Sequence, residues 1–127
     1  MAKKIVYTPD APEPLGIYSQ AVVCNGLVFS AGQIAVDPKT GNLIEDNFEN
    51  QVIRILENIK IILEEAGSTL DNILKFTVFI KDLKNFPVVN DVFGRYFKTD
   101  PPARSVVQIS RLPKDASIEI ECIAAIK

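Results

Sequence analysis

Residues 100–123 read DPPARSVVQISRLPKDASIEIECI, and the rest of this 127-residue chain is organised around this segment. Two prolines restrict the backbone just before Arg104, which opens a short apolar strand. A loop then leads into an alternating run that contains Glu119 and Glu121. The planar guanidinium of an arginine suits a substrate carboxylate, and a nearby carboxylate can activate water. The segment therefore predicts a site for a small acid, with a structural ion pair at a hairpin as the alternative.

The composition is that of one globular domain, which we expect to span residues 1–127. Hydrophobic residues make up 47% of the chain and charged residues 24%, a balance that excludes a disordered protein. The net charge is −2, without a concentrated basic face. Because phosphate backbones are bound by such faces, this charge argues against nucleic acid as the main partner.

Several residue types are missing, and their absence excludes whole classes of chemistry. The chain has no histidine, which rules out Ser–His–Asp and Cys–His catalysis and histidine-containing zinc sites. Cys24 and Cys122 lie far apart in apolar runs, where free cysteine usually behaves as a small hydrophobe; a disulfide between them is the alternative. The amino terminus lacks an apolar signal region, and no run reaches membrane-spanning length. We therefore expect a cytoplasmic protein.

Periodicity and turn residues predict the secondary structure. Asn25-Gly26 is a strong hairpin signal, because a type I′ turn needs positive φ at both central residues. An apolar stripe at helical spacing begins after Asp46, the expected N-cap, and Gly67 ends that helix. Pro87 suits the first turn of a second helix. We expect strands at residues 3–8, 21–24, 27–31, 73–81, 104–110 and 117–126, and helices at 47–66 and 82–98.

The order of these elements predicts an α+β fold in which both helices cover one face of a mixed sheet. The last strand is apolar on both sides, because Ile123 and Ala125 point away from the other apolar residues; Phe79 adds to this second face. A single chain of this length has no third layer to cover such a surface. We therefore expect a homo-oligomer that packs sheet against sheet, with Arg104, Glu119 and Glu121 lining a groove at or near the interface.

Several motifs make the chain similar to a known family. They are GIYSQA (16–21), SAGQI (30–34), FTVFIKDL (76–83), VN (89–90), PARS (102–105), RLPKD (111–115) and IEIE (118–121). Together they resemble the Rid/YjgF family, most closely its RidA branch of reactive-intermediate deaminases. The resemblance implies a chorismate-mutase-like fold and a homotrimer with a central barrel and clefts between subunits. It also implies hydrolysis of 2-imino acids, such as 2-iminobutanoate and 2-iminopropanoate, to 2-oxo acids and ammonia, without cofactor or metal.

The resemblance also assigns the site residues. Arg104 matches the residue that grips the substrate carboxylate, and Glu119 matches the carboxylate associated with the attacking water. Tyr18, Gly32 and Asn90 match other positions of the cleft. Glu119 and Arg104 as a cross-strand ion pair, Tyr18 as a loop anchor and Asn90 as a cap of the second helix are the plainer alternatives.

Two positions depart from the family pattern. Val106, also a candidate substrate-binding position, stands where the enteric branch has a cysteine; a thiol nucleophile is therefore absent, and the backbone must fill any role at this position. Ala31 lacks the hydroxyl that the branch often carries before the glycine, and Ser30 faces the opposite side of its strand. We interpret both changes as tuning substrate preference. A non-catalytic regulator that binds small acids and a translation-inhibiting ribonuclease are the alternative functions.

Overall fold

Strands and helices follow one another in the expected order within residues 2–127, the part of the chain that the computed structural model describes. The elements are β1 (Lys4–Val6), β2 (Ala21–Cys24), β3 (Leu27–Ser30), α1 (Phe48–Ala66), β4 (Ile73–Ile80), α2 (Phe86–Tyr96), β5 (Ala103–Gln108) and β6 (Ile118–Ala125). Three 3-10 turns, at Leu70–Asn72, Leu83–Asn85 and Pro113–Asp115, join some of them. The second helix is therefore shorter than expected, because residues 83–85 form a separate turn before it.

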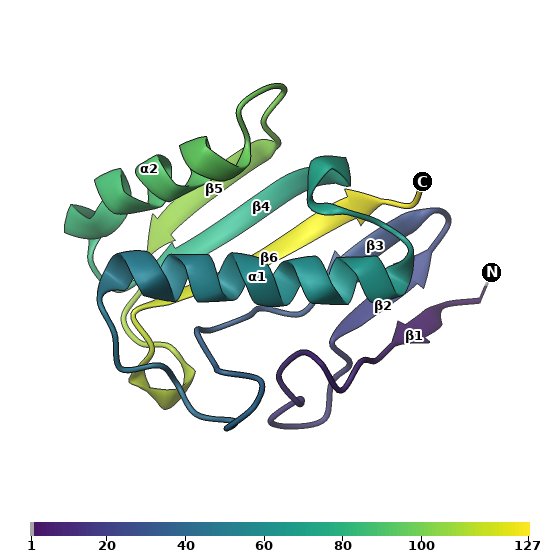
Figure 1. Cartoon of the computed structure of the whole chain (residues 1–127), viewed down its shortest axis with the longest axis horizontal. Helices are drawn as coiled ribbons and strands as arrows, with labels where there is room; N and C mark the ends of the chain where they lie inside the picture. Colours follow the sequence, from purple (N-terminus) through teal and green to yellow (C-terminus); the bar gives the residue numbers. More distant parts are fainter. Residues whose placement is uncertain (1) are drawn as a thin grey trace.

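All six strands form one mixed sheet, with the strand order β1-β2-β3-β6-β4-β5. β4 and β5 pair in parallel, and the other neighbours pair antiparallel. Parallel neighbours need a crossover connection, and α2 supplies it between β4 and β5 (Figure 1). Asn25 and Gly26 have φ values of 51° and 75°, as the predicted tight turn between β2 and β3 requires. The α+β class and the mixed sheet are thus confirmed.

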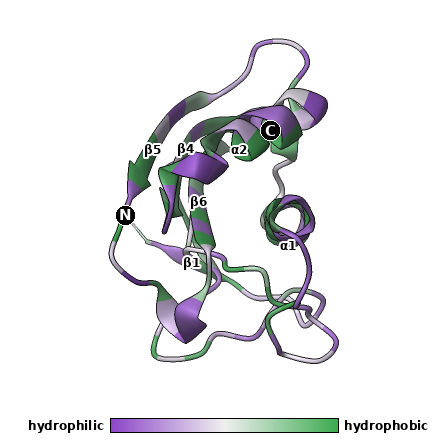
Figure 2. Cartoon of the chain, turned by 90° about the vertical axis from the view of Figure 1, so that its left-hand side faces the viewer, coloured by the Kyte–Doolittle hydropathy of each residue, from purple (hydrophilic) through white to green (hydrophobic). Residues whose placement is uncertain are grey.

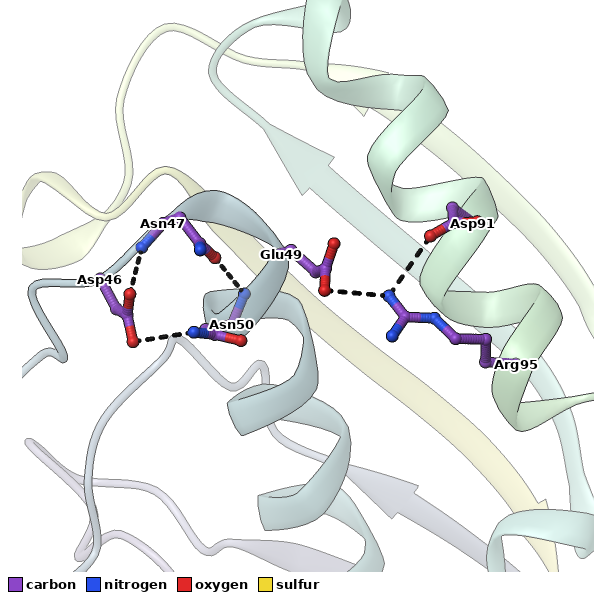
Figure 3. A network of polar contacts seen from close by, with 6 residues as sticks. All are labelled: Asp46, Asn47, Glu49, Asn50, Asp91 and Arg95. Carbon is purple, nitrogen blue, oxygen red and sulfur yellow. Dashed lines mark hydrogen bonds and ion pairs between the residues drawn. The ribbon is translucent and has the colours of Figure 1, made fainter.

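The start of α1 differs from the expectation. Asn47, not Asp46, is the N-cap, and its side chain accepts a hydrogen bond from the Asn50 amide at 2.8 Å. Asp46 instead accepts from the Asn47 amide and from the Asn50 side chain, while Glu49 pairs with Arg95 of α2 (Figure 3). Both Asp and Asn are good caps, so spacing alone did not separate the two neighbours. Gly67 ends the helix in the left-handed conformation, as predicted.

The two faces of the sheet have different surroundings. Both helices lie on one side, and this side holds the core (Figure 2). The alternating residues of β4 and β6 that face it are fully or almost fully buried: Phe76, Val78, Ile80, Ile118, Ile120, Cys122 and Ala124. No described helix covers the other face, which we call the open face. The strand registers place Ile5, Phe29 and Val107 on it, and their exposed fractions are 51%, 42% and 42%. The two-sided apolar strands are therefore present as predicted.

The two cysteines lie on different sides of this sheet and are both free. Cys122 is buried in the core and pairs in register with Phe76. Cys24 pairs with Leu27, which pairs with Ala125 on the open face. The disulfide considered from sequence is therefore excluded within one chain. Within residues 2–127 neither helix combines the length and the apolar character needed to cross a membrane.

Candidate functional site

Arg104 lies on the helix-covered side of β5. Its register partner on β4 is Phe76, a core residue, and directly paired residues point to the same face. α2 passes over this position and offers Asn90, whose side-chain oxygen accepts a hydrogen bond from Arg104 Nη2 at 2.8 Å. The guanidinium carbon also lies over the rings of Phe86 and Phe93, at 5.4 and 5.3 Å from their centroids. Asn90 is therefore a partner of the arginine rather than a helix cap.

Aromatic rings, prolines and one amide surround this arginine, and no ion pair is formed with it in the described part of the chain. A hollow of about 400 Å³ adjoins it, lined by Asn90, Phe93, Gly94, Phe97, Pro101, Pro102 and Arg104. Among the described residues no carboxylate forms an ion pair with Arg104. Burial lowers the pKa of its guanidinium, but arginine remains protonated in proteins. The result is a half-buried cation whose charge no carboxylate of residues 2–127 neutralises through an ion pair, a natural binding group for an anion.

Glu119 lies on the open face of β6. It pairs in register with Phe79, and the two neighbours of Phe79 in β4, Val78 and Ile80, point into the core on the other side. A second hollow, of about 240 Å³, is lined by Leu15, Tyr18, Ala31, Gly32, Ile34, Pro113 and Glu119. Burial, followed by the charge of Glu121, raises the pKa of the Glu119 carboxyl. A carboxylate with a raised pKa is a better general base than an ordinary one.

Gly32 leaves room for this carboxylate. The glycine lies just beyond the end of β3. A Cβ at this position would overlap Oε2 of Glu119 most closely and would lie 2.7 Å from its Cδ, closer than real Cβ contacts, and 3.0 Å from its Cγ, tighter than most. The side chain of Glu119 therefore approaches the backbone closely at this position, which only glycine permits without displacing the carboxylate.

Tyr18 both anchors its loop and lines the second hollow. Its hydroxyl oxygen accepts a hydrogen bond from the Leu15 amide at 2.9 Å, as the plainer interpretation proposed. Its side chain nevertheless borders the hollow beside Glu119. Ser30 is turned elsewhere, because its hydroxyl accepts from the Cys122 amide at 2.9 Å. The hydroxyl missing at Ala31 is therefore not replaced by Ser30, as predicted.

One chain does not bring Arg104 and Glu119 together. β4 separates their strands, and the registers turn their side chains to opposite faces of the sheet. The ion-pair interpretation is therefore wrong. Arg104 and Asn90 form one half-site; Tyr18, Gly32 and Glu119 form another. Val106 is half-buried and packs against the core, outside both sets of lining residues.

Sequence reasoning missed several lining residues, above all the two rings beside the guanidinium. Neither Phe86 nor Phe93 was among the predicted site residues. A signal was present, because Phe86, Asn90 and Phe93 are spaced by four and three residues and so share one helix face. Leu15 and Pro113, which border the Glu119 hollow, carried no comparable signal. The described residues contain no group of three or more histidine, cysteine or acidic side chains placed to hold a metal ion.

Comparison with known proteins gives a consistent picture. The family model described as endoribonuclease L-PSP matches residues 8–126. The reactive intermediate deaminase A of Arabidopsis thaliana is 40% identical over 98% of this chain and 66% of its own length. A relative from Pyrococcus abyssi, 48% identical over 98% of both chains, is named only as a RutC family protein. Solved structures include a Rid-family protein of Yersinia pestis (TM-score 0.95, 46% identity, 98% of this chain and 100% of that one) and TdcF of E. coli with bound serine (TM-score 0.92, 42% identity, 98% and 99%).

Proposed function

This chain belongs to the Rid/YjgF family, and from that premise we propose that it hydrolyses reactive 2-imino acids to 2-oxo acids and ammonia. The observation that carries the proposal is the Arg104 guanidinium, which lies half-buried beside a hollow and has no ion-pair partner among the described residues. Such a group gains most from a ligand that brings a carboxylate. The 2-imino acids, among them 2-iminobutanoate and 2-iminopropanoate, have a carboxylate next to the reactive carbon.

The names of two relatives support this class of substrate. The plant relative is named a reactive intermediate deaminase. The E. coli relative was solved with serine, which carries a carboxylate and an amine nitrogen on the same carbon. A 2-imino acid has the same arrangement, with a double bond between that carbon and the nitrogen. A site that holds an amino acid in this way is therefore suited to an imino acid.

We propose that the complete site forms between two copies of the chain. Arg104 and Glu119 point to opposite faces of one sheet, so a single copy offers only half of the groups. The open face exposes Phe29 and Val107, each 42% accessible, and a partner sheet would cover them. A homotrimer with a central barrel, as in the family, would place the Glu119 hollow of one subunit beside the Arg104 hollow of the next.

The reaction in this composite site would follow from the two half-sites. Arg104 binds the substrate carboxylate and places the iminium carbon beside Glu119 of the neighbouring copy. Glu119 takes a proton from water as the water oxygen bonds to that carbon, which gives a carbinolamine. Glu119 then returns that proton to the nitrogen and takes the proton of the carbinolamine hydroxyl as the carbon–nitrogen bond breaks. The nitrogen leaves as ammonia, the 2-oxo acid remains, and Glu119 passes the remaining proton to ammonia or to solvent. A hydrogen bond between the attacking water and the backbone near Val106 would take the place of the cysteine that the enteric branch has at this position. No step uses a cofactor.

Arg104→Ala tests the proposal. In an assay that couples threonine dehydratase to imine hydrolysis, we expect its rate to fall roughly a hundredfold or more, since removing an oriented electrostatic contact typically costs that much. Arg95→Ala is the matched control, because Arg95 makes exposed ion pairs with Glu49 and Asp91 outside both hollows. Wild-type turnover by a folded Arg104→Ala protein would refute the mechanism.

A binding protein without turnover is the second candidate, because the unpaired Arg104 alone would suffice to sense 2-oxo acids. Glu119→Ala separates the two functions. In an enzyme this change abolishes hydrolysis, whereas a sensor has no hydrolysis to lose and keeps its affinity for 2-oxobutanoate. Isothermal titration beside the coupled assay measures both quantities.

The description of the family model as an endoribonuclease keeps ribonuclease activity as a further alternative. The net charge of −2 disfavours it, because RNA binding rests on concentrated positive charge. A labelled single-stranded RNA tests this activity. Cleavage by a wild-type preparation free of contaminating nucleases, together with loss of cleavage in Glu119→Ala, would favour ribonuclease activity over imine hydrolysis.

A further inference from the structure

One face of α2 surrounds the guanidinium of Arg104 with two rings and an amide. Phe86, Asn90 and Phe93 lie at positions i, i+4 and i+7 of this helix, and all three contact the arginine. The rings lie 5.4 and 5.3 Å from the guanidinium carbon, within the range of a cation–π interaction. We call these three residues the aromatic cradle.

We propose that the aromatic cradle fixes the guanidinium in one orientation before a ligand arrives, and that Phe86 and Phe93 are positioning residues for a planar carboxylate. This inference rests on the anion site of the proposed function and deepens it. Asn90 occupies one N–H of Nη2, and the rings cover the carbon of the group. The other donors of the planar group therefore remain for the ligand, in a fixed plane.

The cradle is itself held in place. Phe93 is only 6% exposed and packs edge-on against Phe76 of β4, with ring centroids 4.9 Å apart. The turn that precedes α2 is tied to the end of β5, because the Leu83 amide donates to the side-chain oxygen of Gln108 at 2.9 Å. β5 also carries Arg104, so the rings and the arginine keep their relative positions.

A fixed arginine has two measurable consequences. Ordering a flexible side chain at the moment of binding typically reduces affinity about threefold to tenfold, and the cradle removes this cost beforehand. A guanidinium with a fixed plane also matches the two oxygens of a carboxylate better than it matches a tetrahedral anion. The cradle should therefore raise affinity for carboxylates more than affinity for inorganic phosphate.

Phe86→Leu is the decisive variant, because the Phe86 ring is half-buried and its ring contact among the described residues is with Arg104. Titration of the intact protein should show the affinity for 2-oxobutanoate about fivefold lower, with a smaller change for phosphate. Phe86→Tyr keeps an aromatic ring and should restore the wild-type ratio of the two affinities. Phe93→Leu should act in the same direction, with an added loss of thermal stability from the core. KM for the imino acid should rise while kcat changes little.

Phe48→Leu is the matched control, because it removes a half-buried ring at the start of α1, outside the contacts of Arg104. We expect its affinities to equal those of the wild type. Wild-type affinity and selectivity in both Phe86→Leu and Phe93→Leu would overturn the cradle while leaving imine hydrolysis intact. An equal loss of affinity in Phe48→Leu would also overturn it, by showing a general effect of weakened packing. A wild-type protein that binds neither anion would instead overturn the proposed function on which the inference rests.

Discussion

Gly32→Ala should impair the half-site of Glu119 and leave the half-site of Arg104 intact. It should therefore distinguish the roles of the two half-sites better than a substitution that removes a charge. The added Cβ would lie 2.7 Å from Cδ of Glu119, whereas ordinary contact begins at 3.4 Å. The difference requires Cδ to move by about 0.7 Å, and Oε2, which the added Cβ would overlap most closely, must move further. Gly32 has no left-handed φ, so alanine causes no backbone strain. The side chain of Glu119 is partly exposed, so it can turn aside and the fold survives.

The expected loss is large for turnover and small for stability. Misplacing a catalytic group by about 1 Å can cost on the order of a hundredfold in rate, which is about 2.7 kcal/mol in the activation free energy. A strained side-chain rotamer costs only about 0.5–1.5 kcal/mol of stability. The coupled imine assay measures the first quantity and thermal unfolding measures the second. Titration with 2-oxobutanoate should show that the contact with Arg104 is retained.

Two further variants make this prediction refutable. Glu119→Asp shortens the side chain by one methylene group, so in the Gly32→Ala background it should cost little beyond the first change, and the two effects should be strongly non-additive. Gly94→Ala adds a methyl group that meets no atom within 4 Å, so it should stabilise the helix by up to ~1 kcal/mol. Near-normal turnover of folded Gly32→Ala, or simple multiplication of the two losses in the double variant, would refute the reasoning.

Three other changes test separate parts of the structure. Burial and the charge of Glu121 raise the pKa of Glu119, so ionised Glu119 destabilises the fold above that pKa and the penalty disappears as the pH falls through it. Glu119→Gln should therefore unfold at a higher temperature than wild type at pH 8, with the difference shrinking toward acid pH; a constant difference would contradict this. Val107→Lys should lower the mass measured by light scattering, whereas Leu83→Lys, which replaces a 49% exposed leucine off the sheet, should not. Asn47→Ala removes the cap of α1 and should cost about 1 kcal/mol in denaturant unfolding; an unchanged midpoint would show that the neighbouring Asp46 caps in its place.

Local features of the sequence predicted most of the elements. The Asn25-Gly26 turn, the apolar stripe that ends at Gly67 and the alternation in the last strand each depend on residues that are close together in the chain. The boundaries were less accurate. The separate turn before α2 and the cap at Asn47 depend on which of several competent neighbours makes the hydrogen bond, and spacing does not decide that.

The composition and motifs of the chain by themselves determined its family, its class of fold and the identity of Arg104 and Glu119 as candidate residues. Only the tertiary structure decided where these side chains point. β4 lies between β5 and β6, and its registers with them turn Arg104 toward α2 and Glu119 toward the open face. A shift of one residue in either register would reverse the side, because side chains alternate along a strand. Register depends on contacts between strands that are distant in sequence, and so do the rings of Phe86 and Phe93 beside the guanidinium.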